Sequence, residues 1–291
     1  MRQSLRAATL VLLLVMYASA WAQQSDAAPA SSSYTAAQDE TSSRGNDDDL
    51  LLARAAKLYY STKSAALTGF DCTVHPDWLP LIQSSETHST VTENNENVLL
   101  LKGVAISLHA RMNGSSVLDW VQPSNTSKPL DQVSAETLDQ MHKTTQETLM
   151  GFMQFWTPFV DGSVVPPNAR GVEITHSSSG MTLHVKQPDA EVTEVFSNEL
   201  ILKEFKVVTG EKTIDLVPSY DSTDNGLLVS RFVARIGPEN ASATEVQLMH
   251  VEIDYQTIGD FPIPSRLNME VLGTGVFNFK LDGCRVNPTA E

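Results

Sequence analysis

The chain has 291 residues, 41% of them hydrophobic, and a formal charge of −15 at pH 7. This is enough chain and enough apolar surface for one sizeable core. With 20 Lys and Arg against 35 Asp and Glu, the chain lacks the basic surplus that attracts nucleic acid or anionic lipid head groups. The composition excludes both as expected partners and leaves the binding of apolar molecules open.

The first 22 residues have the three parts of a secretory signal peptide. Arg2 and Arg6 form a basic start, an apolar stretch runs from Ala7 to Tyr17, and Ala20-Trp21-Ala22 supplies small residues for cleavage. No later stretch approaches the roughly 20 apolar residues that span a bilayer. We therefore expect a soluble mature protein that is periplasmic or secreted and does not span the membrane. An uncleaved membrane anchor is the alternative.

Residues 23–48 are rich in Ala, Ser, Gln and Asp and show no apolar period, which predicts a disordered linker. The folded region is then expected to be a single domain over residues 49–291, with two small domains as the alternative. Its first element is an amphipathic helix over Asp49–Lys63, because apolar residues recur there on one helical stripe.

Strands are expected next. Ala65–Val74 enters the core and stops at His75-Pro76, and Val98–Met112 alternates apolar and polar residues with a period of two. Asn113-Gly114 favours a tight turn, so Ser116–Gln122 is expected to return as the second arm of a hairpin.

The apolar period changes to about 3.6 from Ser134 to Trp156, which predicts a second helix that ends before Pro158. Its last turns, Leu149–Trp156, are apolar almost all round. Such a segment must either fill the interior of its own sheet or lie against an apolar ligand.

Residues 170–287 contain short alternating segments separated by turn signals, the pattern of an antiparallel meander. The expected strands are Val172–His176, Met181–Lys186, Val192–Phe196, Leu200–Val208, Thr213–Tyr220, Leu227–Ile236, Met249–Tyr255, Leu267–Val271 and Val276–Leu281.

Cys72 and Cys284 are the two cysteines of the chain and lie near the two ends of the expected domain. In an oxidising compartment an isolated pair is most simply a disulfide, here between the first strand and the last. Two free buried thiols or a redox site are the alternatives, although the chain has no Cys-x-x-Cys.

The segment from Ile253 to Leu267 reads as a strand, a glycine-containing turn and the entry to the next strand. Together with the export signal and the N-terminal helix, it resembles the periplasmic lipoprotein-carrier and outer-membrane lipoprotein-sorting superfamily, over residues 49–110 and about 170–286. The resemblance implies an α+β, mainly β fold: an incompletely closed antiparallel barrel of curved meander sheet, capped by an N-terminal helix and a second helix. The helix at 134–156 would belong to an insertion or an enlarged lid over residues 115–168.

An open, apolar sheet must be filled by its own helix or hold an apolar guest. We therefore expect a non-catalytic binding protein of the cell envelope that holds a lipid, an acyl chain or a lipoprotein. The alternative is an envelope sensor or protein-interaction domain on the same scaffold, with Phe261 and Ile263 as exposed contacts. The residues expected to line the concavity, with plain core packing as the alternative for each, are Leu100, Ile106, Leu108, Met153, Phe155, Trp156, Phe232, Met249, Ile253, Tyr255, Leu267 and Met269.

No catalytic residue, metal site or cofactor is expected. The sequence has no Gly-x-Ser-x-Gly, no phosphate-cradling glycine loop and no dinucleotide fingerprint, and its seven His form no His-Glu-x-x-His. A pair of acidic catalytic groups stays open as a third reading, because such a pair is defined by a separation in space.

Overall fold

The structure is a computed structural model that describes residues 39–62, 67–85, 92–113, 115–122, 132–161, 164–210, 212–238, 246–273 and 275–287. The predicted signal peptide, residues 1–22, and most of the predicted linker lie outside these ranges. No helix in the described ranges is both long enough and apolar enough to cross a membrane.

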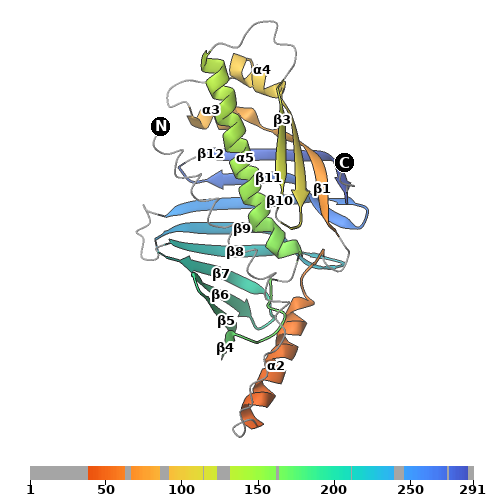
Figure 1. Cartoon of the computed structure of the whole chain (residues 1–291), viewed down its shortest axis with the longest axis vertical. Coiled ribbons are helices and arrows are strands. Elements are labelled where there is room, and N and C mark those ends of the chain that lie inside the picture. Colours follow the sequence, from red (N-terminus) through yellow and green to blue (C-terminus); the bar gives the residue numbers. More distant parts are fainter. Residues whose placement is uncertain are drawn as a thin grey trace.

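The described residues form a mainly β chain that includes two short helices, α3 and α4, not expected from the sequence (Figure 1). The helices are α2 Asp39–Ala56, α3 Trp78–Ser85, α4 Glu96–Lys102 and α5 Gln132–Asp161. The strands are β1 Gly69–Pro76, β2 Ala105–Arg111, β3 Val117–Val121, β4 Val172–Ser177, β5 Gly180–Gln187, β6 Ala190–Ser197, β7 Leu202–Thr209, β8 Lys212–Thr223, β9 Gly226–Pro238, β10 Gln247–Ile258, β11 Phe261–Val271 and β12 Gly275–Val286.

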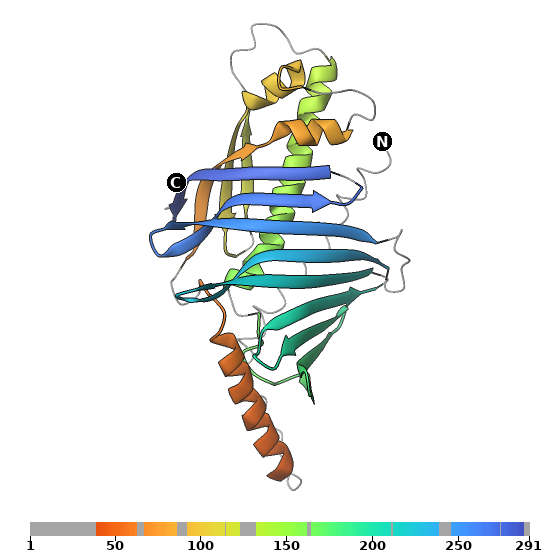
Figure 2. The ribbon, with the colours of Figure 1, turned by 180° about the vertical axis from the view of Figure 1, so that it is seen from behind.

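All twelve strands belong to one antiparallel sheet with the order β3-β2-β1-β12-β11-β10-β9-β8-β7-β6-β5-β4. The edges, β3 and β4, do not meet, so the sheet is curved but not closed into a barrel (Figures 1 and 2). Neighbours in the chain are neighbours in the sheet because short turns favour hairpins. The exceptions are β3 and β4, which follow each other in the chain but lie at opposite edges, and β1, which pairs with the last strand β12 as well as with β2. The predicted fold class is confirmed.

The predicted disulfide is also confirmed. Cys72 on β1 and Cys284 on β12 are joined at an S–S distance of 2.04 Å, across 212 residues of sequence. The two strands pair from Phe70 with Val286 to Pro76 with Phe279, and the register shifts next to Cys72. The bond therefore links the start of the domain to its end.

Helix α5 covers one face of the sheet, which we call the inner face. Figure 1 shows α5 crossing β12, β11, β10 and β9, with its C-terminal end near β8. The strands beneath alternate as expected: Val251 and Ile253 of β10 are buried, whereas His250 and Glu252 are exposed. The hydrophobic core lies between α5 and this face.

Helix α2 differs from the predicted helix over Asp49–Lys63. It begins at Asp39, inside the segment expected to be disordered, and ends at Ala56. Its last turns are anchored by buried Leu52 and Ala55, and its N-terminal part projects away from the sheet (Figure 1). A helix that projects into solvent needs no apolar stripe. The lack of an apolar period over residues 39–48 therefore did not exclude a helix there.

The prediction of one strand over Val98–Met112 is wrong in its first half, where the structure has helix α4. Asn95 caps this helix by accepting a hydrogen bond from the backbone nitrogen of Asn97 at 2.9 Å. Val98 and Leu101, one helical turn apart, are buried. A run of consecutive apolar residues fits both the period of two of a strand and the period of 3.6 of a helix. The Asn95 cap favours the helix.

Helix α5 also continues past its predicted end before Pro158, to Asp161. A proline inside a helix removes one backbone hydrogen bond and typically costs about 3 kcal/mol. Burial of Phe159 and Val160 in the same turn offsets this cost. The backbone nitrogen of Thr62 also donates to the Val160 carbonyl at 2.6 Å.

Candidate functional site

The structure brings the twelve predicted lining residues into one apolar cluster. Three of them, Leu100, Met249 and Tyr255, are partly buried at its margin, and Leu100 lies on helix α4 instead of the sheet. The nine that are buried within the cluster are Ile106, Leu108, Met153, Phe155, Trp156, Phe232, Ile253, Leu267 and Met269.

The aromatic end of α5 packs directly on the inner face. Trp156 is 0% exposed, and its ring centroid lies 5.9 Å from that of Phe70 on β1. The ring of Phe155 lies 5.8 Å from that of Phe232 on β9. Of the two alternatives for this segment, the structure shows the helix filling its own sheet.

One polar relay connects α5 to the sheet beneath it. The indole nitrogen Nε1 of Trp156 donates to the hydroxyl of Tyr255 at 2.9 Å, and this hydroxyl donates to the carbonyl of Val229 at 2.6 Å. Burial raises the pKa of Tyr255, so the phenol keeps its proton and the relay holds at physiological pH.

A buried carboxyl lies further along the inner face. Glu194 on β6 has the same phase as Val192 and Phe196, so its side chain points into the core between the cross-strand neighbours Leu183 and Phe205. It is 2% exposed, and burial raises its pKa to about 8. At neutral pH the carboxyl is therefore mostly protonated.

Two tyrosines complete what we call the buried polar cluster: Tyr59, Glu194 and Tyr220. The rings of Tyr59 and Tyr220 meet edge to face with centroids 5.4 Å apart. The Tyr59 hydroxyl donates to the Leu200 carbonyl at 3.0 Å and accepts from the Leu202 nitrogen at 2.7 Å. Its pKa is raised to about 12 by burial, lowered in part by the Leu202 bond and raised further by the charge of Glu194.

Two atoms of this cluster are left without a hydrogen bond. Within the described ranges, neither Oε2 of Glu194 nor the hydroxyl of Tyr220 has a partner, and both atoms are buried. An unpaired buried polar group typically costs about 1–3 kcal/mol. Natural sequences retain such groups for a reason, often at a binding or catalytic site.

The segment Leu58–Tyr60 holds Tyr59 in place by pairing with the β8–β9 turn. The Leu227 nitrogen donates to the Leu58 carbonyl at 2.7 Å, and the Tyr60 nitrogen donates to the Leu227 carbonyl at 2.9 Å. Gly226 in the turn has φ +117°, and a Cβ there would lie 2.8 Å from the Tyr59 and Tyr60 backbone. Only glycine permits this approach.

Sequence reasoning placed Val192–Phe196 and Thr213–Tyr220 on strands but missed Glu194, Tyr59 and Tyr220 as site residues. The signal was the phase of β6, which sets Glu194 between the inward-facing Val192 and Phe196. An acidic residue at an inward position of a strand is the feature that identifies the cluster.

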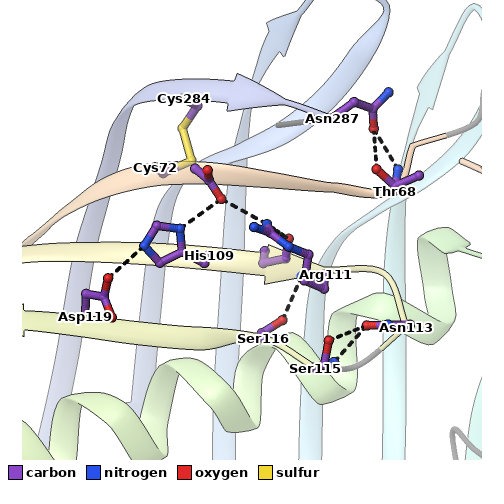
Figure 3. Close-up of polar contacts among 12 residues, drawn as sticks. Thr68, Cys72, His109, Arg111, Asn113, Ser115, Ser116, Asp119, Cys284 and Asn287 are labelled. Atoms are coloured by element: carbon purple, nitrogen blue, oxygen red, sulfur yellow. Dashed lines mark hydrogen bonds and ion pairs between the residues drawn. A yellow bond between two sulfur atoms is a disulfide. The ribbon is translucent and has the colours of Figure 1, made fainter. Parts of the chain in front are cut away.

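A second polar group lies on the opposite face, beside the disulfide (Figure 3). His109 on β2 contacts Asp71 at 3.1 Å through Nδ1 and Asp119 at 3.1 Å through Nε2, and Arg111 contacts Asp71 at 2.9 Å. Burial raises the pKa of Asp71, but bonds from Arg111 and His109 outweigh it and leave the pKa below its usual value. These ion pairs connect β1, β2 and β3.

In the part of the chain that the structure describes, no group of three or more His, Cys, Asp and Glu is arranged to hold a metal ion. His176 and His184, on the two strands of the β4–β5 hairpin, have separate partners. His176 contacts Asp48 at 3.2 Å, whereas His184 contacts Thr193 at 3.1 Å.

The contact surface expected for the alternative function is not present as predicted. Ile263 is 0% exposed and Phe261 is partly buried. The reason is that the expected link is itself a hairpin: β10 extends to Ile258 and β11 begins at Phe261. Ile263 is therefore a core residue.

Comparison with protein-family models, curated proteins and solved structures found no match to this chain. The resemblance to lipoprotein carriers thus rests on the sequence features given above.

Proposed function

We propose that this chain is an exported, non-catalytic binding protein of the cell envelope that holds one lipid or acyl chain on the inner face of its sheet. The proposal rests on one feature of the fold: an open sheet with an apolar inner face covered by the long helix α5. Because the sheet is open, an apolar guest can take the place of α5 as the cover of this face without breaking any strand pairing.

Such an exchange has two opposing energy terms. An acyl chain contributes about 0.8 kcal/mol for each CH₂ group it buries. The same transfer would expose apolar side chains of α5, of which Phe155 and Trp156 lie directly on the sheet. The net free energy of lipid uptake is the difference between these two opposing terms.

The hydrogen bonds from Trp156 to Tyr255 and from Tyr255 to Val229 help to hold α5 on the sheet. Tyr255→Phe removes the hydroxyl and leaves the Trp156 indole and the Val229 carbonyl without this bond. We expect the variant to loosen α5 and to take up lipid more readily than wild type. Tyr60→Phe is the matched control, because its hydroxyl is buried but makes no hydrogen bond within the described ranges.

The test combines native mass spectrometry with hydrogen exchange. Protein exported into the periplasm of a bacterial host and purified without detergent should carry one acyl-chain molecule per chain, identified after solvent extraction. Loading with lipid should speed exchange over Leu149–Asp161, more in Tyr255→Phe than in Tyr60→Phe. Absence of any bound acyl chain, together with unchanged exchange of α5 at saturating lipid, would overturn the proposal.

A further inference from the structure

The buried polar cluster lies next to the relay that holds α5. Tyr220 on β8 pairs with Val229 on β9. The Val229 carbonyl accepts the Tyr255 hydroxyl, which in turn accepts the Trp156 indole. A single path of contacts therefore leads from the aromatic end of α5 to Tyr220.

Glu194 and Tyr220 have hydrogen-bonding capacity to offer such a guest. The Tyr59 hydroxyl is used by the backbone of Leu200 and Leu202. By contrast, Oε2 of Glu194 and the Tyr220 hydroxyl have no partner among the described residues. Both groups border Tyr59: the rings of Tyr59 and Tyr220 are 5.4 Å apart, and the charge of Glu194 contributes to the raised pKa of both tyrosines. They form a buried pair set in apolar surroundings.

The chemistry of this pair selects one kind of head group. A protonated carboxyl and a phenol can each donate and accept a hydrogen bond. Burial alone accounts for the altered pKa of Glu194, with no contribution from a cation. An anionic head such as a phosphate or carboxylate would thus enter an apolar site without a counter-ion. An uncharged hydroxyl needs none, and it can both donate and accept a hydrogen bond with these groups.

We propose that Glu194 and Tyr220 bind the uncharged, hydroxyl-bearing head of a molecule whose apolar chain lies on the inner face of the sheet. The ligand class is that of long-chain alcohols and monoacylglycerols. This inference rests on the proposed function, since the apolar chain occupies the face that α5 covers.

Three probes with the same ten-carbon chain test it: decan-1-ol, 1-chlorodecane and decanoate. Their affinities are measured at pH 6 by native mass spectrometry. We expect wild type to bind the alcohol about tenfold more tightly than the chloride, the effect of roughly one net hydrogen bond, and to bind decanoate more weakly than the alcohol. In Glu194→Leu and Tyr220→Phe the alcohol should lose this advantage, while the affinity for 1-chlorodecane stays within about twofold of wild type.

Two further variants keep the test decisive. Glu194→Gln preserves shape and hydrogen bonding, so it should retain part of the preference for the alcohol even if Glu194→Leu fails to fold. Tyr60→Phe should retain all of it. Chain binding without any preference for the alcohol, or an unchanged preference in the variants, would overturn this inference and leave the proposed function standing. If no probe binds, both fall.

Discussion

Glu194→Gln tests the inward placement of this carboxyl most directly. Burial raises the pKa of Glu194 from 4.5 to about 8. The folded protein therefore retains a proton that the unfolded chain releases between these two pH values. Its contribution to stability is fully present below pH 4.5 and falls by about 1.4 kcal/mol for each pH unit up to about 8. The total loss is about 5 kcal/mol.

Glutamine does not titrate, so the variant lacks this loss. We expect the free energy of unfolding of Glu194→Gln, relative to wild type, to rise by about 4 kcal/mol between pH 5 and pH 8. Urea unfolding at constant ionic strength, with the disulfide intact, measures it. Glu191→Gln on the same strand is the matched control, because its side chain is 52% exposed and should shift stability by no more than about 0.5 kcal/mol. A pH-independent difference between Glu194→Gln and wild type would refute the reasoning.

Three other substitutions test the structural elements that frame the site. Joint replacement of Cys72 and Cys284 by Ser removes a cross-link between residues 212 positions apart, and the chain-entropy model predicts a loss of about 5 kcal/mol in the free energy of unfolding. The loss should appear as a lower Tm, and an unchanged Tm would argue against the cross-link. Gly226→Ala should lower the free energy of unfolding in urea by about 2–3 kcal/mol, because the φ of +117° at Gly226 and the backbone atoms 2.8 Å away leave no room for a Cβ. The same variant should speed hydrogen exchange at the Tyr60 amide. Asn95→Ala removes only the cap of α4, so a loss of about 1 kcal/mol is expected, and a loss as large as that of Gly226→Ala would contradict this ranking.

Much of the sheet could be predicted from short-range patterns. The strand around Val251 and Ile253 alternates apolar and polar residues because successive side chains point to opposite faces. The long helix around Phe152 follows from the 3.6 period. The disulfide was predicted from the two cysteines of the chain together with the predicted export signal. Each of these inferences depends on residues close in sequence or on simple elimination.

Other features depended on packing that no local pattern contains. The apolar run at Leu99–Leu101 fits both a strand and a helix, and burial of Val98 with Leu101 beneath the cap makes it helix α4. Pro158 stays inside α5 because Phe159 and Val160 are buried in the same turn. Local propensity disfavours such a helix, and the tertiary core compensates.

The candidate site shows the same division. The sequence by itself determined that Glu194 lies on a strand among apolar neighbours, and that an amphipathic helix and an alternating sheet would build an apolar interior. Only the tertiary structure decided that Tyr59, from the start of the domain, packs against Tyr220 and shares the core with Glu194, and that α5 covers the sheet. The physical reason is that side-chain direction follows from local backbone geometry, whereas the groups that share an interior are set by strand pairing and packing between segments far apart in the chain.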